Sequence, residues 1–199
     1  MHPSSLDTKR RVFHEGVAGP DETARADQML DVFLAQDGST TRTCEAIAGV
    51  APAVRVLGQG PTADVPKIVR ELMPAANYLE RFSSMVARGE TMMDNLVYGV
   101  WEQLPQAMRR DLESANVPIG RMLDELWVRR IALPASSCVE MWERLWGAVG
   151  LPDARASRAY TVESPAGVLL VIAETFRAGM RMTPLPLTGV PTDLQCLSR

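Results

Sequence analysis

Alternating hydrophobic and polar positions near the C-terminal end give the strongest secondary-structure signal of the chain. Two β-prone runs, Tyr160–Glu163 and Val168–Phe176, flank a turn-forming sequence, SPAG, at residues 164–167. This pattern predicts a β-hairpin. The second run contains VLLVIA, the most hydrophobic window of the sequence, and both of its faces are hydrophobic. We therefore expect this strand to lie at the centre of a sheet that is covered on both sides.

Glu174 is a charged residue inside this hydrophobic strand. Period-two alternation places it on one face with Leu170, Ile172 and Phe176. A buried carboxylate is costly unless it is paired or protonated. A structural partner would offset that cost, and Arg158, at the far end of the same hairpin, is one candidate. A bound ligand is the alternative.

The rest of the pattern predicts one α+β domain with a mainly antiparallel sheet and helices inserted between hairpins. Residues 1–20 are polar and are expected to form a flexible tail, which leaves residues 21–199 for the domain. The expected strands are Arg42–Ala48 and Pro52–Leu57, paired through Gly49, then Asn77–Ala87, Thr91–Trp101 and Trp127–Leu133. The expected helices are Asp21–Leu34, one or two turns in Val65–Leu72, Pro105–Ala115, Gly120–Leu126, and a helix capped by Ser136 or Ser137 that ends at Gly150. Residues 58–64 are expected to form a loop, and Ala178–Arg199 an irregular tail.

Arg81 lies within a predicted strand and shares a face with Leu79 and Met85. One interpretation is an arginine at the rim of the sheet that extends its charged end into solvent. The other is a clamp for an anion at the floor of a pocket, because a guanidinium group matches a carboxylate with two parallel hydrogen bonds.

Composition excludes several classes of protein. The chain has 199 residues, 46% of them hydrophobic, which suffices for one core. A net charge of −3 argues against nucleic-acid binding, and no hydrophobic stretch is long enough to span a membrane. The N-terminus lacks the hydrophobic region of a secretory signal. The three cysteines are widely spaced, which is typical of reduced thiols in a cytoplasmic protein.

Missing residue types narrow the chemistry further. The only histidines, His2 and His14, lie in the predicted tail. Catalysis by Ser-His-Asp or Cys-His groups is therefore not expected, and neither is a histidine-rich metal site. The sequence has no phosphate-binding loop motif, and residues 58–60 (GQG) lack the third glycine of a dinucleotide fingerprint. The remaining arginines, carboxylates, tyrosines and backbone groups suit anionic substrates and chemistry without metal or cofactor.

Three stretches together resemble the chorismate pyruvate-lyase family, in particular its actinobacterial-type branch that makes 4-hydroxybenzoate. They are LAQDGSTTR at residues 34–42, LERFSSMV at 79–86 followed by the LP of residues 104–105 and the NVPIG of 116–120, and RAYTVESPAGVLLVIAETF at 158–176. They are similar to the family's turn after its first helix, its Leu-x-Arg strand with a Pro-Leu-Gly corner, and its Arg-x-Tyr hairpin. Their order and approximate spacing agree over residues 25–177.

The resemblance implies a compact antiparallel sheet around a buried site that is closed by flaps. It implies that Arg81 binds the ring carboxylate of the substrate, helped by the backbone amide of Ile119. It also implies that Glu174 engages the ring hydroxyl and that Thr40 makes the contact at the turn. Such a lyase needs positioning and electrostatics more than a nucleophile or a metal, because chorismate carries its own leaving group. Arg81 and Glu174 would be its catalytic residues.

Departures from the family pattern leave other functions open. The predicted strand Thr91–Trp101 carries Asp94, Tyr98 and Trp101, which could reshape the pocket. One alternative is the same fold acting as a cyclase or isomerase on another unsaturated or polyketide-like substrate. Another is a non-catalytic effector-binding module like the ligand domains of some transcription regulators, although the residues before the first predicted helix are too few for a winged-helix domain. We expect a small-molecule substrate, no nucleic-acid or membrane partner, and a monomer or dimer.

Overall fold

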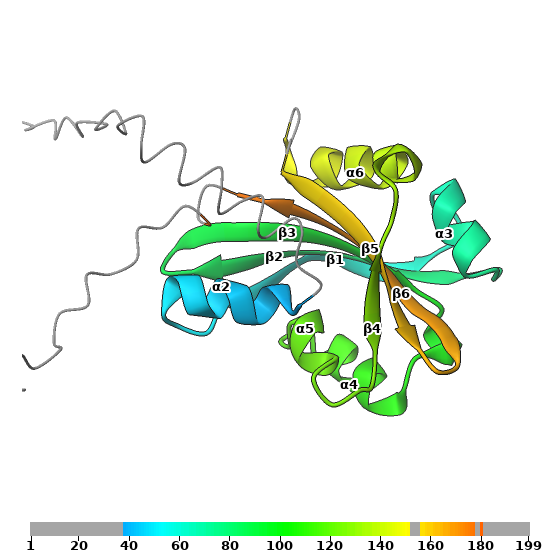
Figure 1. The fold of residues 1–199 in the computed structure, drawn as a ribbon, viewed down its shortest axis with the longest axis horizontal. Helices are drawn as coiled ribbons and strands as arrows, with labels where there is room; N and C mark the ends of the chain where they lie inside the picture. The colour runs from blue at the N-terminus through cyan, green and yellow to red at the C-terminus, as the bar shows by residue number, and fades with distance from the viewer. Residues whose placement is uncertain (1–37, 152–155, 178–179, 181–199) are drawn as a thin grey trace, which may run out of the picture.

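A computed structural model describes residues 38–151, 156–177 and 180 of the chain. Its centre is an antiparallel sheet of six strands in the order β1-β2-β3-β6-β5-β4 (Figure 1). The strands are β1 (Ala53–Thr62), β2 (Tyr78–Ala87), β3 (Glu90–Gly99), β4 (Arg129–Ala132), β5 (Ser157–Ser164) and β6 (Gly167–Phe176). The helices are α2 (Thr40–Ala48), α3 (Lys67–Leu72), α4 (Gln106–Ser114), α5 (Ile119–Met122) and α6 (Ala135–Val149), with a 3-10 turn at Trp101–Gln103.

Two hairpins, β2–β3 and β5–β6, form the middle of the sheet and pair with each other along β3 and β6. The hydrophobic strand β6 is thus central, as its sequence predicts, and its residues from Leu169 to Phe176 are buried. The predicted α+β class with a mainly antiparallel sheet is confirmed. The predicted strands at 77–87, 91–101 and 127–133 are also confirmed, with boundaries that differ by a few residues.

Helices cover both faces of the sheet, as Figure 1 shows: α3 and α6 lie on one side, and α2, α4 and α5 on the other. We call the first side the α6 face, which carries Tyr98 and Val171 packed against α3 and α6. The opposite side is the cavity face, where Val97 and Ile172 pack against α4 and α5. Strand alternation places Arg81 and Glu174 together on the cavity face.

The predicted hairpin of Arg42–Ala48 with Pro52–Leu57 is wrong in its first half, because residues 40–48 form helix α2. Thr41, Cys44 and Ala48 are buried at helical spacing, and Gly49 ends the helix with a φ of 64° and an N–H donated to the Glu45 carbonyl. The threonines have local β propensity, and burial of this helical stripe outweighs it. The hairpin partner of β1 is instead β2.

Three other boundaries differ from the prediction. Residues 58–62 are part of β1 and not a loop. Helix α6 begins after Pro134 without a side-chain cap, so the predicted serine cap is absent. Helix α5 is limited to four residues. The predicted tail at 1–20, the helix at Asp21–Leu34, and Ala178–Arg199 apart from Met180 lie outside the described residues.

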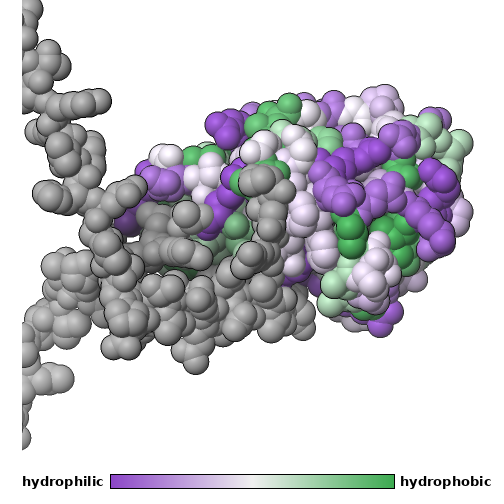
Figure 2. Space-filling model, turned by 90° about the horizontal axis from the view of Figure 1, so that it is seen from above, coloured by the Kyte–Doolittle hydropathy of each residue, from purple (hydrophilic) through white to green (hydrophobic). Residues whose placement is uncertain are grey.

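The side of the molecule that carries α3 and α6 is shown in Figure 2, where polar residues cover much of the surface between smaller hydrophobic areas. One polar network helps to hold this side together. Arg144 of α6 donates hydrogen bonds to Glu80 at 2.9 Å and to Asp64 at 2.6 Å, and the Tyr98 hydroxyl donates to Glu80 at 2.6 Å. None of the helices in the described residues is long and hydrophobic enough to cross a membrane.

Candidate functional site

A small cavity lies on the cavity face, between the sheet and the helices α2 and α5. Its volume is about 20 Å³, which is enough for a water molecule and too little for an organic ligand. The wall is mixed, with hydrophobic groups such as Val97 and Ile172 beside polar groups such as Ser83 and Asn95. A ligand of ring size therefore requires α2 or α5 to move away from the sheet.

Three of the four residues that the sequence singles out meet at this cavity. Thr40, Ile119 and Glu174 all line it, although they come from α2, α5 and β6. The fourth, Arg81, lies on the same face of β2. It does not line the cavity itself, although Val97, which pairs with it on β3, does. Segments more than 130 residues apart are thus brought together, with Thr40 and Glu174 in direct contact.

Glu174 is a fully hydrogen-bonded carboxylate. The Thr40 hydroxyl donates to both of its oxygens at 3.0 Å, the Tyr160 hydroxyl donates to Oε1 at 2.8 Å, and Arg158 Nε donates to Oε2 at 2.8 Å. Its side chain is 4% exposed, and that of Arg158 is 10% exposed. Burial and the negative charge of Glu174 raise the pKa of the Tyr160 phenol, so this hydroxyl stays protonated and donates. The predicted structural partner, Arg158, is present.

Thr40 connects helix α2 to this buried ion pair. It is the first residue of the helix, and its hydroxyl accepts a hydrogen bond from Arg158 Nη2 at 2.6 Å while it donates to Glu174. Its neighbour Thr41 lies against α5, where a Cβ on Gly120 would come within 2.9 Å of the Thr41 Cβ. Only glycine allows this approach, so the start of α2 is in close contact with both the sheet and α5.

Arg81 has the opposite character to Glu174. Its side chain is 0% exposed, and the one hydrogen bond that it makes to the described residues goes from Nη2 to the Val117 carbonyl at 3.3 Å. Nε and Nη1 are buried and have no hydrogen-bond partner in the described part of the chain. Burial lowers the pKa of this guanidinium group, since desolvation disfavours its charge. The rim interpretation of Arg81 is therefore excluded, and its charged end lies inside the protein.

Arg130 and Asn95 are cavity residues that the sequence analysis missed. Arg130 lies on the edge strand β4, where it pairs with Val162. Asn95 lies between Ser83 on β2 and Glu174 on β6 in the strand register. Strand alternation in residues 127–133 and 91–101 gave a signal for both, but it did not say which alternate residues face inward.

Asp94 and Tyr98, which were expected to reshape the pocket, lie on the α6 face of β3. Asp94 is buried. It accepts a hydrogen bond from Ser84 at 2.6 Å and forms an ion pair with Arg177. Trp101 follows β3 and does not line this cavity. Among the residues that the structure describes, no cluster of His, Cys, Asp and Glu could hold a metal ion.

Comparisons with known proteins give matches in structure alone. No family model matches the chain, and no curated protein matches it. PhnF from Mycobacterium smegmatis matches with a TM-score of 0.47 and 13% identity over 75% of this chain and 67% of that chain. The ligand-binding domain of a putative GntR-family transcriptional regulator from Bordetella bronchiseptica matches with a TM-score of 0.42 and 10% identity over 63% and 84%. A possible transcriptional regulator, YydK from Bacillus subtilis, matches over 65% of this chain with a TM-score of 0.41 and 10% identity. The match covers 58% of the length of that protein.

Proposed function

We propose that this protein is a non-catalytic module that binds a small organic anion between the sheet and the helices α2 and α5. The observation that carries the proposal is Arg81. Arg81 is 0% exposed, and its Nε and Nη1 atoms lack any partner among the described residues, which leaves a buried charge without a counter-charge from that part of the chain. Buried charges in proteins are normally paired, because desolvation costs several kcal/mol per ion. A carboxylate or another acidic group on a ligand would supply the pair.

The state of Glu174 favours binding over catalysis. A general acid or base must exchange a proton with the substrate, and its oxygens must be within reach of the reacting group. In this protein three side chains already donate to the two oxygens of Glu174. A substrate hydroxyl would have to displace Thr40 or Tyr160 from the carboxylate. The pair of Glu174 and Arg158 therefore serves to hold α2 on the sheet.

Calorimetric titration with benzoate tests the proposal, because benzoate carries one carboxylate on a ring and no further acidic group. We expect saturable binding to the wild-type protein. Arg81→Gln removes the charge and is expected to weaken binding by about 2–5 kcal/mol, a loss of roughly 30-fold or more. Arg55→Gln is the matched control, since Arg55 is exposed on the neighbouring strand β1 and should leave binding unchanged. Equal benzoate affinity in wild type and Arg81→Gln would refute the proposal.

A second candidate function is the chorismate lyase activity that the sequence resemblance implies. The specific observation in its favour is that Thr40, Ile119 and Glu174 line one cavity, with Arg81 on the same face of the sheet. Chorismate incubated with the protein in the presence of EDTA, and analysed for 4-hydroxybenzoate by chromatography, separates the two. Product formation that is lost in Arg81→Lys would establish the lyase, because lysine keeps the charge without the two-pronged geometry. Binding of chorismate without product formation would support the non-catalytic binding module.

A further inference from the structure

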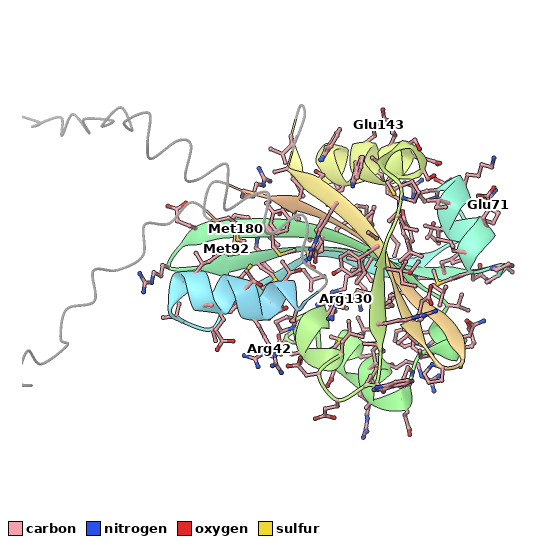
Figure 3. The ribbon with its side chains drawn as sticks, viewed as in Figure 1. Arg42, Glu71, Met92, Arg130, Glu143 and Met180 are labelled. Atoms are coloured by element: carbon pink, nitrogen blue, oxygen red, sulfur yellow. The ribbon has the colours of Figure 1, made fainter. Side chains whose placement is uncertain are left out.

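Arg130 is a second positively charged group at the cavity. It comes from β4, a strand of four residues at one edge of the sheet, and its side chain lines the cavity together with Tyr160 and Ile172. Figure 3 shows Arg130 close to α5 and to the end of α2 that faces it. The guanidinium Nε is buried and has no hydrogen-bond partner among the described residues. Arg130 is thus placed where its charge acts on whatever fills the cavity.

The charges around the cavity do not balance. Among the described residues of the wall, Glu174 is the one acidic side chain, and Arg158 already neutralises it. Arg130 makes no ion pair with any described residue, and Arg81, beside the cavity, makes none either. Two guanidinium groups are therefore left without a counter-charge from the described part of the chain. Arg81 is fully buried and Arg130 is partly buried with its Nε shielded from solvent, so their attraction for an anion is stronger than in water.

The two arginines come from well-separated strands of the sheet. Arg81 lies on β2, Arg130 lies on β4, and the strands β3, β6 and β5 separate them in the sheet. Asn95 and Tyr160 occupy the intervening strands on the cavity face. A ligand that contacts both arginines must therefore extend across these middle strands and carry its acidic groups at its two ends.

We propose that the ligand of this cavity is a dianion with two separated acidic groups, one bound by Arg81 and the other by Arg130. This inference rests on the proposed binding function and adds to it the class of ligand and a second anion-binding residue. Each guanidinium group binds a carboxylate through charge-assisted hydrogen bonds, and each is positioned by a strand of the sheet. Arg130 therefore discriminates between ligands with one acidic group and ligands with two.

The experiment compares benzoate, isophthalate and terephthalate by calorimetric titration at one pH and ionic strength. The last two carry a second carboxylate on the same ring in two geometries. We expect at least one of the dicarboxylates to bind wild type about tenfold or more tightly than benzoate, which is the effect of one hydrogen-bonded charged group. Arg130→Gln should reduce that preference to about threefold or less. Arg130→Lys, which keeps the charge, should retain part of the preference.

Arg129→Gln is the matched control. Arg129 precedes Arg130 on the same strand, points to the other face, and forms an exposed ion pair with Glu163 at 2.7 Å. Its loss should leave the preference for the dicarboxylate intact. Equal affinity for benzoate and both dicarboxylates in wild type, or a preference that survives Arg130→Gln, overturns the inference and leaves the binding function standing. Absence of binding of all three acids refutes the binding function itself.

Discussion

Arg158, whose side chain is 10% exposed, and Arg81, which is fully buried, lie on the cavity face of the same sheet, and they differ in what surrounds them. Arg158 contacts Glu174 at 2.8 Å and Thr40 at 2.6 Å, and its guanidinium lies 5.2 Å from the centre of the Tyr160 ring. Arg81 donates to one carbonyl at 3.3 Å, and its Nε and Nη1 atoms have no partner among the described residues. Folding satisfies the first arginine completely. The second requires a group that the described part of the chain does not supply.

This difference distinguishes a structural residue, Arg158, from a candidate binding residue, Arg81, on the same face of the sheet. A charged residue with a complete set of partners stabilises the folded chain, and its removal should lower the free energy of unfolding. A charged residue that lacks partners destabilises the folded chain, and proteins tolerate such a cost where activity requires it. The two arginines should therefore respond to substitution with opposite signs of the change in unfolding free energy.

Glu174→Gln is expected to have the largest effect on stability. It keeps the shape of the side chain and removes the carboxylate from a buried arginine, which should lower the free energy of unfolding by about 3–5 kcal/mol. Urea denaturation followed by circular dichroism measures this loss. Glu163→Gln on the same hairpin is the control, because its ion pair with Arg129 is exposed and should contribute less than about 1 kcal/mol. If Glu174→Gln had normal stability and lost ligand binding, the predicted structural role would be wrong and Glu174 would be a binding residue.

Arg81→Met is expected to change stability in the opposite direction. Methionine fills the space of the aliphatic stem and has no N–H groups to leave without partners. We expect the free energy of unfolding of the ligand-free protein to rise by about 1–3 kcal/mol, the cost of unsatisfied buried polar groups, while benzoate binding is lost. The same denaturation experiment measures this change. A loss of stability comparable to that of Glu174→Gln would mean that Arg81 is also satisfied by folding.

Gly120→Ala tests the contact that closes the cavity. The new Cβ would lie within 2.9 Å of the Thr41 Cβ, so α5 or α2 must shift. Such overpacking typically costs about 1–3 kcal/mol. Gly147→Ala in α6 is the control, because no atom lies within 4 Å of the position that its new methyl group would take, and alanine favours the helix by about 0.5–1 kcal/mol. Thermal melting of both variants should move in opposite directions, and a neutral Gly120→Ala would show that α2 and α5 separate easily.

Cys44 gives the smallest of these effects, through pH. Burial and then the negative charge of Glu174 raise the pKa of its thiol from about 9 to about 12. The unfolded chain therefore releases this proton at lower pH than the folded chain, and stability is lost as the pH rises from 9 towards 12. By pH 10 the loss should be about 1.4 kcal/mol. Comparison of unfolding at pH 7 and 10 should show a shallower pH dependence in Cys44→Ala, and an identical dependence would contradict the prediction.

The strands were predictable from sequence because their signal is local. Alternation and turn residues identify the β5–β6 hairpin, and the hairpin register brings Arg158 opposite Glu174. The candidate structural partner of Glu174 could therefore be named from the sequence. Burial of Arg81 could not be decided in the same way, because strand alternation leaves open whether a face packs against helices or against solvent.

Helix α2 and Arg130 depend on contacts between distant segments. Residues 40–48 contain three threonines, which suit a strand locally, and the helix is fixed by the hydrogen bonds of Thr40 to Glu174 and by the approach of Thr41 to Gly120. Arg129 and Arg130 are equivalent in the sequence pattern. The pairing of Arg130 with Val162 decides which of them faces the cavity, and that register forms between strands separated by α6.

The pairing of β3 with β6 also determines when during folding the cavity can exist. Each hairpin contains only neighbouring segments, whereas Asn95 and Glu174 meet across a long stretch of chain that includes α4, α5 and α6. Pairing of such distant strands is slow, since the entropy of closing the loop is lost before the contacts form. We therefore expect a refolding chain to acquire its hairpins first and its capacity to bind an anion only in the last, rate-limiting phase.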